Sequence, residues 1–220
     1  STGGLATGVG SLEYDNRIWI GWPGISSEEI NSDEKLAIET ELKGLNSHPV
    51  FLDKNEISAY YFGFSNRTIW PLFHYFPKNC IFEPKHWEAY KKVNQKFCNA
   101  VLSLADENDT IWIHDYQLLL LPQMIREKLP NAKIGFFLHI PFPSFELIRL
   151  LPWRKEILLG MMGADLIGFH EYDYARHFFE SVHRIAGYEN NLLTITVDNR
   201  IIEIDAFPMG IDYEKYSSAV

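Results

Sequence analysis

Polar side chains that can do chemistry directly follow two of the most apolar runs in this sequence. His114 and Asp115 follow one run, and His139 follows another. A carboxylate or an imidazole at the end of a buried strand is costly unless it is paired or faces a cleft. These three positions are therefore the first candidates for a functional site.

Asp115 has two roles that its sequence context does not separate. An ionised carboxylate can accept two hydroxyl hydrogen bonds from a hexose and so fix the orientation of the sugar. The same side chain stands before an expected helix, where it would cap the helix N-terminus with Tyr116 packed beside it. The two roles are compatible, and both remain open from the sequence.

His139 is followed closely by Pro141 and Pro143. The two prolines predict a rigid turn that would hold the imidazole ring and the local carbonyl groups toward a ligand. A structural histidine whose hydrogen bonds are satisfied within the fold fits the same spacing equally well.

The segment from Tyr60 to Tyr75 contains more aromatic rings than one helix face can bury. Tyr and Trp each offer an apolar platform with one hydrogen-bond donor, which suits a sugar. On composition alone, however, we favour an aromatic core segment in which Trp70 and Pro71 break a helix.

A glycine-rich stretch near the start of the chain contains Gly3, Gly4, Gly8 and Gly10. Missing side chains let backbone N–H groups approach a phosphate or a sugar closely. The stretch is a weak signal by itself, because no strand precedes it as a dinucleotide-binding fingerprint requires.

Motifs for metal binding and for hydrolysis have little support. The run from His170 to His177 does not match His-Glu-x-x-His, and its two histidines fall two helical turns apart. We interpret Glu171 and Asp173 as acidic residues at a helix start. The sequence contains neither a Gly-x-Ser-x-Gly motif nor a Gly-Lys-Ser/Thr phosphate loop, which disfavours hydrolases and nucleoside triphosphatases.

Composition predicts one globular domain. The chain has 220 residues, of which 46% are hydrophobic and 15% aromatic, and no linker-like stretch divides it. A net charge of -9 disfavours nucleic acid and an anionic membrane surface as partners, although a few placed donors could still bind a small phosphorylated ligand. Cys80 and Cys98 lack metal or disulfide spacing, so we expect buried, reduced thiols. Because no leader or membrane span is found, we expect a soluble, cytoplasmic protein.

The elements that must position these residues alternate between short β-rich runs and longer helical patterns. This order is typical of an α/β fold with a largely parallel sheet. The expected strands are residues 17–21, 49–52, 110–114, 133–138, 165–169, 192–197 and 200–206, the last two forming a hairpin around Asp198 and Asn199. The expected helices are residues 33–45, 85–105, 118–129, 144–151, 154–162 and 172–187. Because ligands of open α/β sheets bind beyond the carboxyl ends of the strands, the candidates after these strands are the residues to follow.

Several stretches occur together in the order of a known family. They are Gly3 to Leu5, Tyr60 to Asn66, Ile69 to Tyr75, Trp112 to Tyr116, Gly135 to Pro143, Leu166 to His170 and Phe207 to Asp212. Together they resemble the amino-terminal half of the trehalose-6-phosphate synthase family, glycosyltransferase family 20, over almost the whole chain. The His-Asp-Tyr and Phe-Phe-Leu-His-Ile-Pro-Phe-Pro stretches are the specific part of this resemblance.

The resemblance implies the Rossmann-like, amino-terminal half of a GT-B glycosyltransferase, with helices on both faces of the sheet and the active site in a cleft between two domains. The implied enzyme transfers glucose from UDP-glucose to glucose 6-phosphate, giving trehalose 6-phosphate with retention of the anomeric configuration, and needs no metal or cofactor. Its partners would be these two small molecules and its own carboxyl-terminal domain. The protein would orient the reactants and supply electrostatics for front-face attack assisted by the leaving phosphate.

The resemblance also implies roles for individual residues. The acceptor-binding positions are matched by Tyr61, Trp70 and Asp115. The donor-binding positions are matched by Gly3, Gly4 and His139. The expected catalytic residues are thus His139, which would lie against the transferred glucose, and Asp115, which would bind sugar hydroxyls.

Residues 1–220 would form the acceptor-side domain alone. The family's first strand, which ends in an arginine for the acceptor phosphate, would precede Gly3, and the carboxyl-terminal nucleotide-sugar domain would follow Asp212. We therefore expect an isolated domain of a larger enzyme. Two other readings stay open: a synthase for another acceptor such as glycerol 3-phosphate, and a non-catalytic module that senses sugar phosphate.

Overall fold

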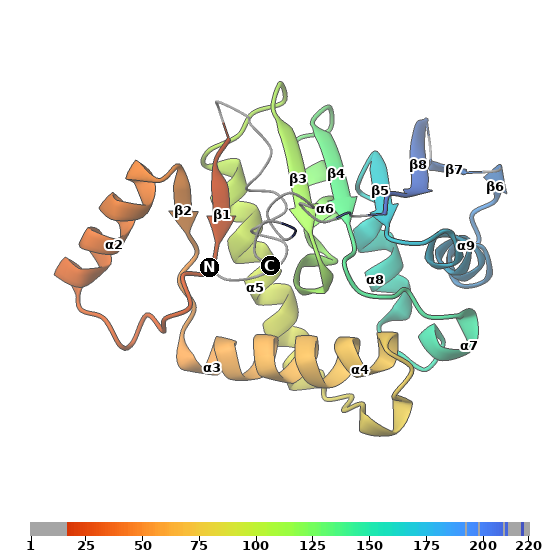
Figure 1. Ribbon diagram of the computed structural model, residues 1–220, viewed down its shortest axis with the longest axis horizontal. Helices are drawn as coiled ribbons and strands as arrows, with labels where there is room; N and C mark the ends of the chain where they lie inside the picture. The colour runs from red at the N-terminus through yellow and green to blue at the C-terminus, as the bar shows by residue number, and fades with distance from the viewer. Residues whose placement is uncertain (1–16, 192, 198, 209, 211–216, 218–220) are drawn as a thin grey trace.

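A six-stranded sheet with the strand order β3–β4–β5–β8–β7–β6 forms the centre of the structure (Figure 1). The computed structural model describes residues 17–191, 193–197, 199–208, 210 and 217. The strands of the sheet are β3 (Thr110–His114), β4 (Lys133–Phe137), β5 (Leu166–Phe169), β6 (Asn190–Asn191), β7 (Thr194–Val197) and β8 (Arg200–Ala206). A parallel pair, β1 (Trp19–Gly21) and β2 (Ser47–Pro49), lies on the β3 side of this sheet (Figure 1).

The pairing of the strands confirms the predicted α/β class. β3, β4, β5 and β8 are neighbours and run parallel. β7 pairs antiparallel with β8, as predicted for the strands on either side of Asp198 and Asn199, and Val197 pairs with Arg200. Asp198, in the expected turn, lies outside the described residues. The short strand β6, which pairs antiparallel with β7, was not expected.

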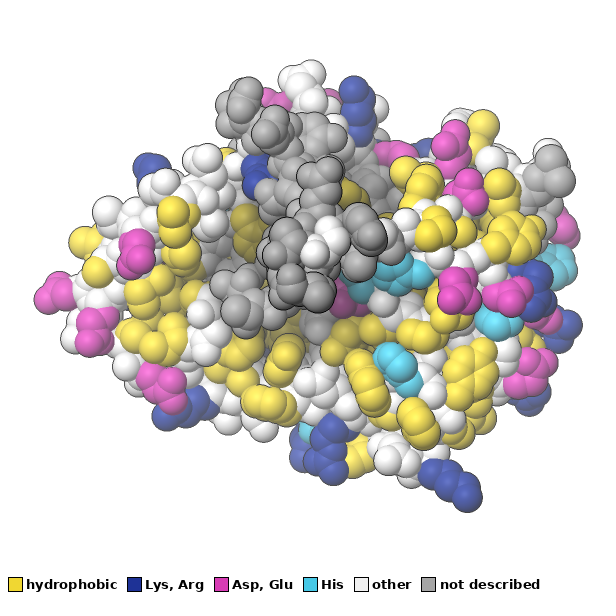
Figure 2. All heavy atoms as spheres, in the orientation of Figure 1, with side chains coloured by type: hydrophobic (Ala, Val, Ile, Leu, Met, Phe, Trp, Pro, Cys, Tyr) yellow, Lys and Arg dark blue, Asp and Glu magenta, His cyan; other side chains and the backbone are white. Residues whose placement is uncertain are grey.

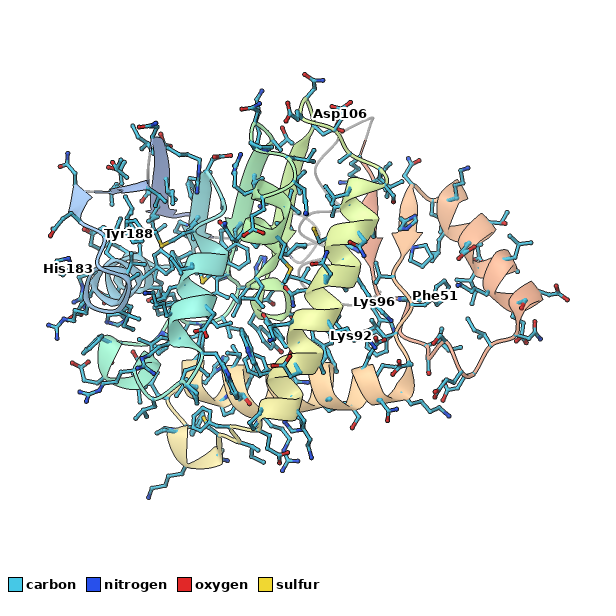
Figure 3. All side chains as sticks on the ribbon, turned by 180° about the vertical axis from the view of Figure 1, so that it is seen from behind. Phe51, Lys92, Lys96, Asp106, His183 and Tyr188 are labelled. Carbon is cyan, nitrogen blue, oxygen red and sulfur yellow. The ribbon has the colours of Figure 1, made fainter. Side chains whose placement is uncertain are left out.

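Helices connect the parallel strands and flank the sheet. The helical segments are α2 (Ser32–Gly44), α3 (Lys54–Glu56), η1 (Ile57–Ile69), α4 (Trp70–Phe73), η2 (Pro77–Asn79), α5 (Pro84–Leu102), η3 (Tyr116–Leu118), α6 (Leu121–Arg126), α7 (Phe145–Ile148), α8 (Arg154–Met161), α9 (Tyr172–Ser181) and η4 (Val182–Ala186). The connections from β3 to β4 and from β4 to β5 step in the same direction along the sheet. Right-handed connections that step in one direction place their helices on the same face of the sheet. Accordingly, α5, α6 and α8 lie behind the sheet in Figure 1 and in front of it in Figure 3.

The core lies between this helical layer and the sheet. α5 buries a stripe of large apolar side chains on one face, formed by Trp87, Tyr90, Val93, Phe97 and Val101. Burying one such large side chain contributes roughly 1.5–3 kcal/mol, so the stripe holds α5 firmly in place. This rigid layer supports the strand ends that carry the polar residues.

A long helix spans residues 54–73 and crosses the foot of the sheet in Figure 1. The expectation that Trp70 and Pro71 break a helix is wrong. Segment η1 is π-helical, and α4 continues from it through Pro71. Pro71 has no N–H to donate to the preceding turn, and one carbonyl of that turn, Arg67, accepts a hydrogen bond from the Ile81 N–H at 2.8 Å. A distant part of the chain therefore supplies a hydrogen bond to the turn that precedes the proline.

A buried carboxylate fastens the start of the long helix to α5. Glu56 is only 3% exposed, and its oxygens lie 2.6 Å from the Lys96 ammonium and 3.0 Å from that of Lys92. Lys96 also donates to the Phe51 carbonyl at 3.5 Å, and Figure 3 shows both lysines on the side of α5 that faces Phe51. Burial acts to raise the pKa of Glu56, but the hydrogen bonds from Lys96, Asp53 and Lys92 together lower it below its ordinary value. The ionised form is therefore the one that the fold stabilises.

The two cysteines are not joined by a disulfide. Cys98 is buried, whereas Cys80 is only partly buried, so the expectation of buried thiols holds for one of them. Across the described part of the chain, we find no helix with the length and apolar character needed to cross a bilayer.

Glu56→Gln should lower the free energy of unfolding by about 2 kcal/mol at pH 7, because the charge-assisted bonds to two lysines are lost. The folded-state pKa of Glu56 lies below the unfolded value of about 4.3, so its contribution is present above that pH and is lost as the pH falls. Urea unfolding at pH 7 and pH 3 measures the difference. The control is Glu88→Gln, which removes an exposed glutamate of α5 paired with Lys91. Equal effects of the two substitutions at pH 7 would contradict the anchoring role.

Candidate functional site

Three histidines meet at the carboxyl ends of three neighbouring parallel strands. His114 ends β3, His139 follows β4, and His170 follows β5 directly. The ring centroids of His114 and His139 are 5.3 Å apart, and those of His139 and His170 are 5.5 Å apart. Figure 2 shows histidine side chains gathered near the ends of these strands, among hydrophobic side chains. The strand ends thus come together at one edge of the sheet, as their parallel pairing requires.

His114 and His139 share a hydrogen bond. The Nδ1 atom of His114 lies 3.1 Å from the Nε2 atom of His139. The pKa of each imidazole is lowered to about 4, for His114 by burial and for His139 by burial together with the neighbouring His114 and His170. Both rings are therefore neutral at pH 7, so one donates to the other and Nδ1 of His139 is left for another partner.

Asp115 adopts a backbone conformation that favours glycine. Its φ is 71°, and its N–H donates to the Phe137 carbonyl at 2.8 Å, which continues the β3–β4 ladder past His114. With a ψ of 173°, Asp115 lies outside the left-handed helical region that aspartate tolerates and in a region almost confined to glycine, where a non-glycine residue stores roughly 1–3 kcal/mol of strain. The conformation turns the chain sharply out of the sheet at the point where the carboxylate is presented.

The Asp115 carboxylate uses one oxygen for the fold. Its Oδ1 accepts hydrogen bonds from the N–H groups of Tyr116 at 3.0 Å and His139 at 3.3 Å. Neither bond uses Oδ2, which accepts no hydrogen bond from any residue that the structure describes. Asp115 therefore does cap the turn that follows it, as one of its two predicted roles requires, and keeps an oxygen for a ligand.

Burial raises the pKa of Asp115 to about 6, and the two N–H groups and the nearby His74 only partly oppose this shift. The carboxyl is thus destabilised in its charged form before any ligand arrives. Ligand hydroxyl groups that donate to Oδ2 would stabilise the ionised carboxylate, because hydrogen bonds to the charged form favour it. The electrostatics of the site therefore favour a ligand rich in hydroxyl groups.

Tyr61 and Trp70 lie on the long helix and face different surroundings. Tyr61 is partly buried and packs against Trp22, with ring centroids 5.6 Å apart. Trp70 is 41% exposed, so the composition-based expectation of a buried aromatic segment is wrong for this residue. An exposed indole at a polar site offers an apolar platform that no core contact requires.

Both aromatic residues are linked electrostatically to the strand-end cluster. The Trp70 ring stacks on His74 with centroids 4.0 Å apart, and His74 is close enough to Asp115 to lower the pKa of its carboxyl. Tyr61 acts on Tyr116: the pKa of the Tyr116 hydroxyl is raised by burial, by Asp115 and by Tyr61. That hydroxyl donates to Asn66 Oδ1 of the long helix at 2.9 Å. Gly3 and Gly4 lie outside the described residues.

The loop after β4 is held from two sides. The Tyr75 hydroxyl accepts a hydrogen bond from the Ser144 N–H at 3.0 Å, and Nδ1 of His177 lies 3.2 Å from the Phe142 carbonyl. The rigid turn expected from Pro141 and Pro143 thus has additional supports. His177 has a structural contact here, and within the described ranges we find no group of three His, Cys, Asp or Glu side chains placed to hold a metal ion.

Sequence reasoning missed His74, Asn66 and Tyr75 as supports of the site. Each acts across a long chain separation: Tyr116 is 50 positions after Asn66, and Ser144 is 69 positions after Tyr75. The high aromatic content of residues 60–75 and the resemblance of this segment to the family were the signals that drew attention to it. It could not tell which side chains reach the sheet.

Asp115→Asn should raise the free energy of unfolding above pH 6 by about 1–2 kcal/mol. The wild-type carboxyl has a folded-state pKa of about 6, above its unfolded value of about 3.9, so the stability present at low pH is lost as the pH rises through 6. Asparagine can accept the same two N–H bonds and carries no charge. Urea unfolding at pH 4 and pH 8 measures the effect, with Asp33→Asn on the exposed first turn of α2 as control. A loss of stability at pH 8 would contradict this account of the site.

Comparisons with known proteins give the site its context. Residues 1–220 match the sequence profile described as Glycosyltransferase family 20. The UDP-forming α,α-trehalose-phosphate synthase of Emericella nidulans is 45% identical over 226 residues, which cover 100% of this chain and 44% of that protein. The chain spans less than half the length of the curated relatives that it matches.

Two solved structures share the fold. The amino-terminal domain of Candida albicans trehalose-6-phosphate phosphatase is 39% identical, with a TM-score of 0.81 over 89% of this chain and 42% of that one. A UDP-forming α,α-trehalose-phosphate synthase of Burkholderia xenovorans in complex with glucose 6-phosphate is 30% identical, with a TM-score of 0.82 over 99% of this chain and 48% of that one. The profile match over the whole chain and the 45% identity agree with the motifs read from the sequence, and the chain belongs to glycosyltransferase family 20.

Proposed function

We propose that the chain supplies the acceptor side of a trehalose-6-phosphate synthase, which transfers glucose from UDP-glucose to glucose 6-phosphate and releases UDP. Family membership and the activity for which the Emericella nidulans relative is named support the reaction class. The observation that carries the proposal is the Asp115 carboxylate, with Oδ1 held by two backbone N–H groups and Oδ2 free of partners among the described residues.

In this proposal Asp115 orients the acceptor sugar. The carboxylate is mostly ionised at pH 7, because its pKa is raised only to about 6. Its Oδ2 accepts hydrogen bonds from hydroxyl groups of glucose 6-phosphate, and partial burial makes these bonds stronger than they would be in water. Fixing the sugar in this way turns the attack of its anomeric hydroxyl into a positioned, effectively unimolecular step.

Tyr61 and Trp70 complete the acceptor side. The exposed Trp70 indole, stacked on His74, offers a flat apolar surface for the C–H face of the sugar. Tyr61 is held against Trp22 and within electrostatic range of Tyr116, so its hydroxyl can reach the same ligand without a large rearrangement. Both residues belong to one helix that Glu56 fastens to α5, which keeps them in register with Asp115.

His139 lies on the donor side in this proposal. Its Nε2 is engaged with His114, so Nδ1 is the nitrogen available to the transferred glucose. When His114 donates to Nε2, His139 carries its proton on Nδ1 and can donate to a sugar oxygen. Gly3 and Gly4 are proposed to approach the donor through their backbone N–H groups, on the basis of the family resemblance.

The proposed reaction retains the anomeric configuration and requires no metal, with the leaving phosphate assisting front-face attack. The chain's own residues contribute orientation and preorganised hydrogen bonds. We also propose a cytoplasmic location, which the two unpaired cysteines favour, because reducing compartments keep thiols free.

We further propose that residues 1–220 act as one Rossmann-like acceptor-side domain and that turnover needs a second domain of the kind that relatives carry. Catalysis by differential binding of the transition state requires both walls of the cleft. The chain matches only 44% of the Emericella nidulans relative, which leaves room for such a domain there. A non-catalytic role is the second candidate, favoured by the likeness to the amino-terminal domain of Candida albicans trehalose-6-phosphate phosphatase.

The purified 220-residue chain should show no turnover with UDP-glucose and glucose 6-phosphate, whereas the chain joined to the carboxyl-terminal region of the Emericella nidulans relative should release UDP. In the joined protein, Asp115→Ala should reduce kcat/KM by at least about tenfold, since orienting hydrogen bonds contribute roughly 1.4 kcal/mol or more. UDP release is measured by a coupled assay. Asp33→Ala is the control and should leave the rate unchanged.

Two results would count against the proposal. Unchanged kinetics in Asp115→Ala would remove Asp115 from the acceptor site. A joined protein that folds and binds glucose 6-phosphate without releasing UDP would favour the non-catalytic role, and fast turnover by the chain alone would refute the need for a second domain.

A further inference from the structure

A polar cavity at the surface is lined by residues that the proposed reaction does not use. It has a volume of about 480 Å³ and is lined by Phe145, Arg149, Arg154, Arg184 and Ile185. These residues come from α7 and the residue after it, the start of α8, and η4. Three guanidinium groups therefore converge on one cavity in a chain whose net charge is -9.

The arginine side chains are arranged around one aromatic ring. The guanidinium carbon of Arg184 lies 4.6 Å from the centroid of the Phe145 ring, and that of Arg149 lies 5.9 Å from it. Arg154 is anchored differently, because its Nη1 donates to the Leu151 carbonyl at 3.1 Å. These contacts restrict long side chains that would otherwise be mobile, so less freedom is lost when an anion binds.

Most of the positive charge at this cavity is not neutralised within the described structure. Arg184 pairs with Glu180 at 2.9 Å. Arg149 and Arg154 form no ion pair with any residue in the described ranges. Glu146 is near enough for both Arg184 and Arg149 to favour its charged form, but it does not line the cavity. Three cations facing one space repel each other, and an anion between them would relieve that repulsion.

We propose that this arginine cavity binds a phosphorylated small molecule through Arg149, Arg154 and Arg184. The planar guanidinium fork matches phosphate oxygens, and its charge-assisted bonds are stronger than neutral ones. The volume lies in the range of small-molecule sites, and the arginine-rich lining disfavours an apolar ligand. The site shares no lining residue with Asp115, Tyr61, Trp70 or His139, and the proposal does not depend on the proposed function.

Isothermal titration of the 220-residue chain with inorganic pyrophosphate at low ionic strength tests this site. Arg149→Gln and Arg184→Gln should each weaken binding by about tenfold, because each removes charge-assisted bonds to the ligand. Arg176→Gln is the matched control: it removes an exposed arginine of α9 that pairs with Asp173 and does not line the cavity. Thermal melting of each variant checks that it is folded.

The expected result is binding that Arg149→Gln and Arg184→Gln weaken and that Arg176→Gln leaves within about twofold of wild type. No binding to the folded wild-type chain at millimolar pyrophosphate would overturn the proposal. Equal weakening by all three substitutions would mean that only overall charge matters and would overturn it as well. Binding of an acidic peptide such as polyglutamate, with pyrophosphate inert, would replace the small molecule with a protein partner.

Discussion

The site depends on the carboxylate of Asp115. The fold holds this residue in an unfavourable backbone conformation and in an environment that disfavours the negative charge. Asp115 has a positive φ, is partly buried, and has a pKa raised to about 6. Its Oδ1 joins the ends of two strands by accepting from the N–H groups of Tyr116 and His139. Strain and desolvation of this kind persist only where the surrounding structure is rigid enough to impose them. The rest of the domain can be understood as the support that this residue requires.

That support comes from three directions. The parallel register of β3 and β4 brings His139 to Asp115 and aligns its ring with His114. The long helix carries Tyr61 and Trp70, and two lysines of α5 hold its first turn through Glu56. The loop after β4 is fixed by Tyr75 and by His177. Contacts far from the candidate ligand groups therefore determine where those groups lie.

The sequence was most informative where local pattern and tertiary environment agree. The strand 110–114 has the predicted bounds, and the strands expected on either side of residues 198–199 pair antiparallel. The same local reasoning failed at Pro71, where the helix continues and the turn before it receives a hydrogen bond from the Ile81 N–H of a different segment. It also could not reveal that Oδ2 of Asp115 stays free while Oδ1 caps the turn, since that division depends on the placement of His139. Motifs located the candidate residues, and long-range hydrogen bonds decided their geometry.

Carbon-13 NMR of the Asp115 side-chain carboxyl, followed as a function of pH in the folded chain, tests the central claim most directly. The account predicts a titration midpoint near pH 6, because burial outweighs the two N–H hydrogen bonds and the nearby His74. A midpoint near the ordinary aspartate value of about 3.9 would mean that the carboxylate is solvated like a surface helix cap. That result would contradict the proposal that the Asp115 carboxylate is desolvated in the free protein and is stabilised by hydroxyl groups of the ligand.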